Sequence, residues 1–241
     1  MKNISQKISN RFLFLACACA AFEAGCAHGP STTNINPQTL LEQACRPGQG
    51  LQAVNGSAWV KAKSKEASGQ FPAEVSVKAP DQLKMEVTNL IGATQALITV
   101  NGSNYKILVP SKNGQSQKQY EGNGYWGGIP LKWATDLFMG KIPCPASDAR
   151  SGAKLSVNED GSLVAEVGNT TNAEKYTYKF RNWEGTPWAE SLHYEKIADS
   201  KLVVDFKFDQ PEDKTRSPKT WEAISSRGEV KLRWKDRTLT R

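Results

Sequence analysis

Residues 94–109 read Thr-Gln-Ala-Leu-Ile-Thr-Val-Asn-Gly-Ser-Asn-Tyr-Lys-Ile-Leu-Val, which is two alternating segments separated by an Asn-Gly pair. Asn101-Gly102 between such segments is the strongest short signal for a β-hairpin, because both residues tolerate the backbone angles of a tight turn. Two strands joined by a tight turn must be antiparallel. The stretch therefore predicts an antiparallel hairpin.

The same period of two continues on both sides of this hairpin. Apolar and polar residues alternate from Trp59 to Val87, and again from Leu155 to Phe180 and from Trp188 to Trp234. One face of each predicted strand is apolar and the other carries Lys, Glu, Thr and Ser, as in antiparallel sheets with one solvated face. The pattern predicts roughly ten short strands. Residues 211–227 are predicted to be a long polar, charged excursion before the last strand.

Two segments break the strand period and predict short helices. The first is Thr39–Cys45, which ends at Arg46-Pro47-Gly48. The second is Ile129–Gly140, with Pro130 near its start and a glycine at its end. Its apolar residues at helical spacing are Leu131, Ala134, Leu137 and Phe138.

Together these elements predict a mainly β (α+β) fold with a single antiparallel sheet strongly curved around one or two helices. A two-sheet sandwich is the alternative. Its usual marker, two cysteines bridging facing strands around a buried Trp, is absent, because Cys45 and Cys144 fall outside the predicted strands.

The first 26 residues read as a lipoprotein signal. A positive segment is followed by the uncharged apolar stretch Phe12–Phe22 and by the cleavage site Ala24-Gly25-Cys26. The apolar stretch is shorter than the roughly 20 residues that span a bilayer, so it predicts an export signal. Glu23 departs from this pattern and leaves open ordinary cleavage to a free periplasmic protein.

From this signal we expect removal of residues 1–25, acylation of Cys26, a flexible tether over 26–38 and a folded domain over 39–241. The tether is rich in Ser, Thr, Asn, Gly and Pro. Ala27 is not the Asp that marks inner-membrane retention in some bacteria. We therefore expect a lipid-anchored protein on the periplasmic face of the outer membrane.

Charge and cysteine content limit the classes of partner. The net charge of the whole chain is +7, and removing three cations and Glu23 with the signal leaves +5. The basic residues are dispersed, which argues against nucleic acid. After Cys26 is acylated, Cys45 and Cys144 remain as one pair, for which a disulfide is the default outside the cytoplasm. Two unrelated thiols are the alternative.

The chain carries no recognisable catalytic or metal-binding pattern. Of its two histidines, His28 lies in the tether and His193 on a predicted strand. No G-x-S-x-G motif occurs, and the glycines of 122–128 do not lie between a strand and a helix. We therefore expect no enzyme activity, no cofactor and no metal. An envelope enzyme stays as a third hypothesis, without a supporting group of residues.

Two segments together resemble the LolB family, outer-membrane lipoproteins that receive lipoproteins from the periplasmic carrier LolA. Residues 79–96, APDQLKMEVTNLIGATQA, resemble the family's strand, "TNPLGST"-like loop and returning strand. Residues 129–143, IPLKWATDLFMGKIP, resemble its "IPL…W…GLP" helix. The likeness covers residues 52–145; beyond Arg150 only the strand pattern supports it.

The resemblance implies an open half-barrel closed by short helices, with acyl chains in an apolar hollow. Ile91 takes the position of the family's protruding Leu, and Leu90 replaces its Pro, so these two residues are the expected membrane-insertion loop. The alternative is that Leu90 and Ile91 end a buried strand. The expected residues of the lid helix and the cavity lining are Leu131, Trp133, Leu137 and Phe138.

The function implied by the resemblance is transfer. A monomer accepts lipoproteins from a LolA-like carrier by their acyl chains and inserts them into the outer membrane. The alternative is an envelope sensor or scaffold with the same fold, which binds a lipid or lipoprotein without transferring it. A Cys45–Cys144 disulfide would fasten both predicted helices together and limit how far the mouth opens.

Overall fold

The computed structural model describes residues 35–64, 68–111, 116–126, 129–169, 172–196, 202–209, 211 and 215–241. The predicted signal and Cys26 lie outside these residues. Thirteen strands of the described chain form one sheet in the order β6-β5-β4-β3-β2-β1-β15-β14-β13-β12-β11-β10-β9. Its strands are β1 (Ala53–Ser64), β2 (Ser68–Lys78), β3 (Gln82–Thr88), β4 (Thr94–Asn101), β5 (Asn104–Val109), β6 (Lys118–Asn123), β9 (Lys154–Val157), β10 (Leu163–Val167), β11 (Glu174–Trp183), β12 (Thr186–Lys196), β13 (Leu202–Phe208), β14 (Thr220–Ser225) and β15 (Gly228–Thr240).

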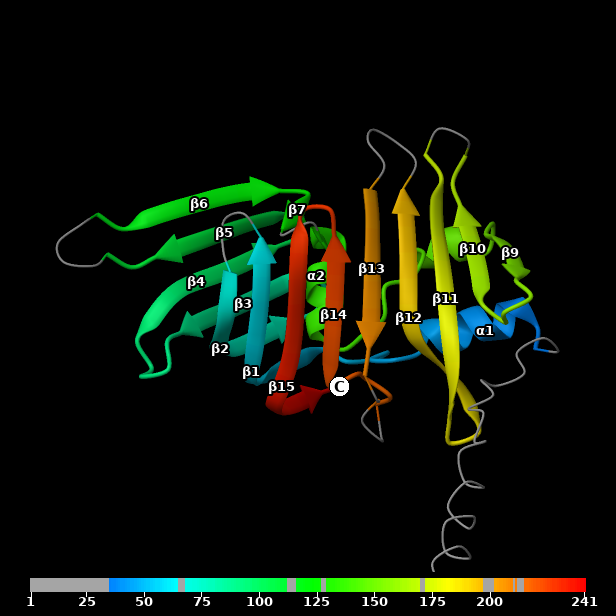
Figure 1. Cartoon of the computed structure of the whole chain (residues 1–241), viewed down its shortest axis with the longest axis horizontal. Coiled ribbons are helices and arrows are strands. Elements are labelled where there is room, and N and C mark those ends of the chain that lie inside the picture. Colours follow the sequence, from blue (N-terminus) through cyan, green and yellow to red (C-terminus); the bar gives the residue numbers. More distant parts are fainter. Residues whose placement is uncertain are drawn as a thin grey trace, which may run out of the picture.

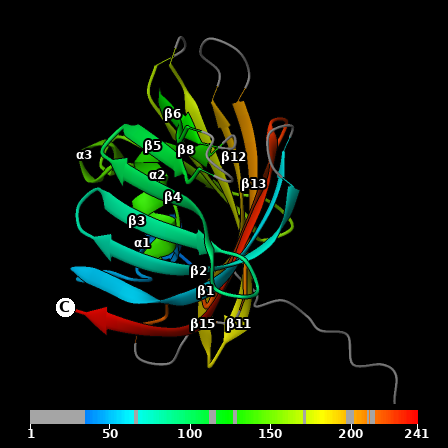
Figure 2. The same ribbon diagram turned by 90° about the vertical axis from the view of Figure 1, so that its left-hand side faces the viewer.

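Every neighbouring pair in the sheet is antiparallel, and the pairing of β1 with β15 joins its two halves. The sheet curves without closing into a barrel, as Figures 1 and 2 show. Bulges at Ser57/Ala58 and at Lys179/Phe180 add local bends. The predicted single curved sheet is therefore confirmed, and the sandwich is excluded.

Two helices cover the apolar face of the sheet. Helix α1 (Pro37–Cys45) begins where Asn36 accepts a hydrogen bond from the Gln38 N–H, and it packs against β9, β10 and β12. Helix α2 (Leu131–Phe138) packs across β2, β3 and β4, and Figure 2 shows these strands wrapped around it. Before α2 come the short paired strands β7 (Tyr125–Trp126) and β8 (Ile129–Pro130); α3 (Ser147–Arg150) follows it.

The prediction of a polar excursion over 211–227 is wrong for its second half. Residues 220–225 form β14, which pairs with β13 on one side and β15 on the other. Trp221 and Ala223 are buried on the core face, while Glu222 and Ile224 alternate with them. The alternation spans only a few residues between charged neighbours, which hid it in the sequence. This strand, together with β6, also brings the sheet to more strands than predicted.

None of the helices in the described part of the chain has the length and apolar character needed to cross a membrane.

Candidate functional site

One row of apolar side chains crosses the core face of the sheet and becomes exposed at one end. In register, it contains Val75 of β2, Met85 of β3, Ile98 of β4, Ile107 of β5 and Tyr120 of β6. The first three are buried, Ile107 is half-buried and Tyr120 is 52% exposed. The row therefore runs from beneath α2 to an apolar edge that this helix does not cover.

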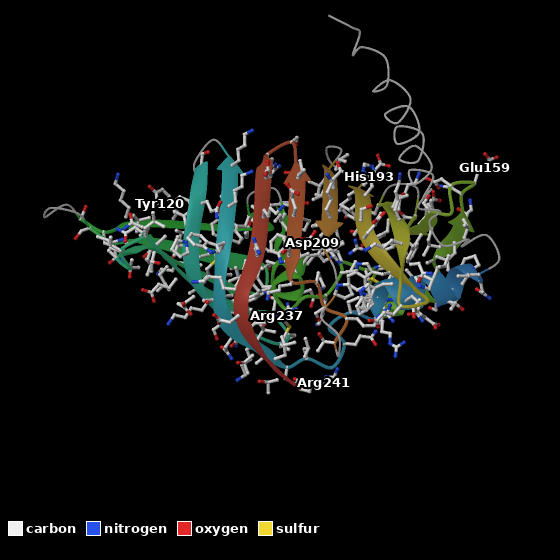
Figure 3. The ribbon with its side chains drawn as sticks, turned by 60° about the horizontal axis from the view of Figure 1, so that its bottom comes forward. Tyr120, Glu159, His193, Asp209, Arg237 and Arg241 are labelled. Carbon is white, nitrogen blue, oxygen red and sulfur yellow. A yellow bond between two sulfur atoms is a disulfide. The ribbon has the colours of Figure 1, made fainter. Side chains whose placement is uncertain are left out.

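Tyr120 marks the end of this edge. In Figure 3 it lies at the left-hand end of the molecule, opposite Glu159, which stands between β9 and β10. The neighbouring apolar residues on this face, Ala96 and Tyr105, are also half-buried against the core. Gly122 leaves room for the Tyr105 ring, because a Cβ at this glycine would stand 2.5 Å from it. We call Ile107, Tyr120, Ala96 and Tyr105 the apolar edge.

The four residues expected to line a lid helix and cavity are all buried in the core: Leu131, Trp133, Leu137 and Phe138. The Trp133 ring lies 4.5 Å from the Tyr194 ring and 5.8 Å from the Phe206 ring, centre to centre. The Phe138 ring lies 5.3 Å from the Trp221 ring. In this arrangement aromatic side chains fill the space between α2 and the strands β12–β14.

A polar network fastens the first turn of α2 to β11. The Lys132 ammonium lies 2.9 Å from a Glu174 carboxylate oxygen, and the Tyr176 hydroxyl donates to the same carboxylate at 2.6 Å. Burial alone would raise the pKa of Glu174, but hydrogen bonds from Tyr176 and Lys132 outweigh it and hold that pKa below its usual value. This part-exposed ion pair adds to the aromatic packing that places α2 on the core.

The connection between β3 and β4 presents two apolar side chains to solvent. Leu90 is 82% exposed and Ile91 is 90% exposed. The Asn89 side-chain oxygen accepts hydrogen bonds from the Ile91 N–H at 3.0 Å and the Ala93 N–H at 2.9 Å. Gly92 has a φ of +84°, which glycine adopts without strain. The turn is therefore well defined, and the two side chains do not pack into the core.

A disulfide joins the two halves of the helical layer. Cys45 at the end of α1 and Cys144 after α2 are bonded, with their Cα atoms 5.9 Å apart. Next to it, the buried Tyr178 hydroxyl donates to the Pro143 carbonyl at 2.9 Å. The predicted pairing of these cysteines is present.

The residues that the sequence did not reveal are Ile107 and Tyr120 of the apolar edge, and Glu174. Tyr120 lies in the polar run Lys118-Gln119-Tyr120-Glu121, which shows no apolar alternation. Its face follows only from the register with Ile107. Extending the Asn101-Gly102 hairpin by one more strand is the only signal that could have found it.

The remaining polar features of the described chain offer no alternative site of comparable definition. An open hollow of about 480 Å³ lies near the Asn101-Gly102 turn, lined by Thr99, Asn101, Asn104, Tyr105, Lys106, Glu121, Gly122 and Asn123. His193 pairs across strands with Asp205, whose Oδ1 lies 2.6 Å from its Nδ1. Among the described residues, no three His, Cys, Asp or Glu side chains are arranged to hold a metal ion.

Comparison with known proteins finds similarity at the level of structure alone. No family model matches the chain, and no curated protein matches it significantly. A LolA superfamily protein from Nitrosomonas europaea matches with a TM-score of 0.48 at 11% identity, over 86% of this chain and 94% of that one. A putative outer membrane lipoprotein-sorting protein domain from Vibrio parahaemolyticus matches with a TM-score of 0.47 at 9% identity, over 85% and 93%.

A further match is the lipoprotein LppX from Mycobacterium tuberculosis, with a TM-score of 0.33 at 15% identity, over 82% of this chain and 92% of that one. At these identities and TM-scores the matches assign the chain to no family. The structure itself is an open antiparallel half-barrel whose apolar face is partly covered by helices and ends in an exposed apolar edge.

Proposed function

We propose that this protein is an outer-membrane lipoprotein that binds the acyl chains of other lipoproteins, accepts them from a periplasmic LolA-like carrier and inserts them into the outer membrane. The observation that carries the proposal is the exposed pair Leu90–Ile91, held on a well-defined turn beside the apolar edge. No catalytic step is part of it.

The apolar edge supplies a surface on which an acyl chain can begin to bind. Exposing such a chain to water costs about 0.8 kcal/mol per CH₂ group, so even partial shielding favours binding. Ile107 and Tyr120 offer that shielding next to α2. Deeper burial requires α2 to move from the aromatic core, and release of the Lys132–Glu174 contact is part of that movement.

Replacing Tyr120 by Asp tests the site on the apolar edge. We expect the affinity for a fluorescent fatty acid to fall about tenfold, because an apolar contact worth about 1.5 kcal/mol is replaced by a charge. Fluorescence titration measures the change. Gln119→Asp is the matched control: it adds the same charge on the same strand but on the opposite face. Equal affinities for the two variants would place the lipid elsewhere.

Transfer is tested by depleting the protein and following lipoproteins between the two membranes. If the proposal holds, lipoproteins accumulate in the inner membrane or the periplasm and do not reach the outer membrane. If their distribution stays normal while the purified protein still carries lipid in native mass spectrometry, the protein is a sensor or scaffold.

The anchor is tested by replacing Cys26 with Ala. This cysteine lies outside the described residues, so the prediction rests on the signal alone. A single acyl chain gives weak membrane binding and several give stable anchoring, so loss of the acylated cysteine should release a soluble protein. Cell fractionation measures the release. A variant that stays with the membranes would contradict the anchor assignment.

A further inference from the structure

A second apolar surface lies on the outer face of the sheet, on the same strands as the apolar edge. Leu97 of β4 and Leu108 of β5 stand opposite each other across these strands. They alternate with Ile98 and Ile107, so they point to the face opposite the core. Both leucines are half-buried. The solvated face of an antiparallel sheet normally carries polar residues at such positions.

Two segments at this end of the sheet are uncharged: the β3–β4 turn together with β4, and the last residues of β5. No charged residue occurs between Val87 and Val100, nor between Ile107 and Ser111. The acidic residue in register with Leu97 is Glu86, whose carboxylate accepts a hydrogen bond from the Thr94 hydroxyl. Two carboxylates border this apolar surface, and each has a partner: Glu86 on β3 accepts from Thr94, and Glu121 on β6 lies beside Lys106. The surface that a lipid bilayer accepts is therefore confined to β4, β5 and the Leu90–Ile91 turn.

Lysines flank the two leucines on the same face. Lys84 and Lys106 occupy the next outer row, with Thr99 between them. Two residues along a strand span about 7 Å, so the lysine row lies about 7 Å from the leucine row along the strands. The Lys106 Nζ also lies 3.6 Å from the Glu121 Oε1, and such an exposed ion pair contributes little to the free energy of folding. A row of apolar side chains with a row of lysines next to it is typical of surfaces that enter a membrane interface. The apolar side chains enter the interface, and the lysines meet the headgroups.

We propose that the outer face around Leu97 and Leu108 enters the bilayer interface together with Leu90–Ile91, and that Lys84 and Lys106 meet anionic lipid headgroups. This inference rests on the proposed insertion function and names the side on which the protein meets the membrane. Figure 1 shows strands β3–β6 running to the left-hand end of the molecule, away from α1 and β9. An acyl chain on the apolar edge then lies on the other face of the same strands.

A depth measurement on the acylated full chain tests the orientation. Cys26 is expected to carry acyl chains and Cys45–Cys144 is a disulfide, so Leu108→Cys adds the one thiol open to a bimane label. The labelled protein is reconstituted in vesicles of phosphatidylethanolamine and phosphatidylglycerol that contain brominated phospholipid. Ile224→Cys is the control, because Ile224 is also a half-exposed apolar residue of the outer face but lies on β14. We expect quenching at position 108 at least about threefold above the control.

Equal quenching at positions 108 and 224 would overturn the proposal. A second outcome would also overturn it: the label at position 108 is not quenched by lipid but becomes shielded as the protein concentration rises. A second copy of the chain would then cover this face. Insertion of cargo is measured on the same samples. If cargo inserts normally without quenching at 108, the orientation fails alone; if no cargo is bound or inserted, the proposed function fails.

The headgroup contact is tested with Lys84→Gln and Lys106→Gln combined. We expect weaker quenching at position 108 in phosphatidylglycerol-containing vesicles and no change in vesicles of phosphatidylcholine alone. The same loss in both vesicle types, or in neither, would overturn the assignment of these lysines to anionic headgroups. Near-ultraviolet circular dichroism of each variant shows that it is folded.

Discussion

Replacing Ile91 by Glu should abolish insertion of cargo lipoproteins into the outer membrane while leaving the fold and acyl-chain binding intact. Ile91 is 90% exposed, so its side chain contributes nothing to the core that a carboxylate would disrupt. Transferring an isoleucine side chain to an apolar environment contributes about 1.5–3 kcal/mol, and an acidic residue reverses that sign. The measurement is cargo insertion into outer-membrane vesicles, with cargo binding followed separately.

Ile224→Glu is the matched control for this variant, because it makes the same chemical change on the outer face of β14, away from the turn. It should insert cargo normally. A variant Ile91→Glu that binds and inserts cargo like the parent protein would remove the turn from the mechanism. If Ile91→Glu unfolds the domain, the residue belongs to the core, against its exposure in the structure.

The curved sheet was predictable because its signal is local. Alternation around Asn101-Gly102 fixes one hairpin, and each further alternating segment has to pair with a neighbour. Helix α2 was predictable for the same reason, since Leu131, Ala134 and Leu137 repeat at helical spacing. The turn at Leu90–Ile91 was expected from the resemblance of residues 79–96 to the LolB family's strand, loop and returning strand, with Asn89 and Gly92 as residues that favour a turn.

The parts that escaped prediction depend on pairing between distant segments. β14 alternates over only six residues, and Trp221 is buried because β13 and β15 flank it. Tyr120 belongs to the apolar edge only through its register with Ile107. Glu174 meets Lys132 across 42 residues of sequence, which no local pattern encodes. The apolar edge therefore needed the structure, whereas the turn did not.

Replacing both Cys45 and Cys144 by Ala should lower the free energy of unfolding by about 2–4 kcal/mol. The bond closes a loop with a sequence separation of 99 residues, and in the chain-entropy model a loop of this size stabilises mainly by restricting the unfolded chain. It is also a covalent link between the end of α1 and the segment after α2. Urea unfolding followed by tryptophan fluorescence measures the loss.

The same double substitution should increase the rate of acyl-chain binding although it lowers stability, because the disulfide restrains the segment that follows α2. If α2 has to leave the aromatic core for deep acyl-chain binding, freeing this segment should speed the binding of a fluorescent fatty acid in stopped-flow experiments. The double Ala variant leaves no free thiol at either position, so mispaired disulfides cannot produce the effect. Thiol labelling of the denatured, unreduced parent protein is the accompanying measurement. Two reactive thiols there, or an unchanged free energy of unfolding in the variant, would show that the bond does not hold the helical layer together.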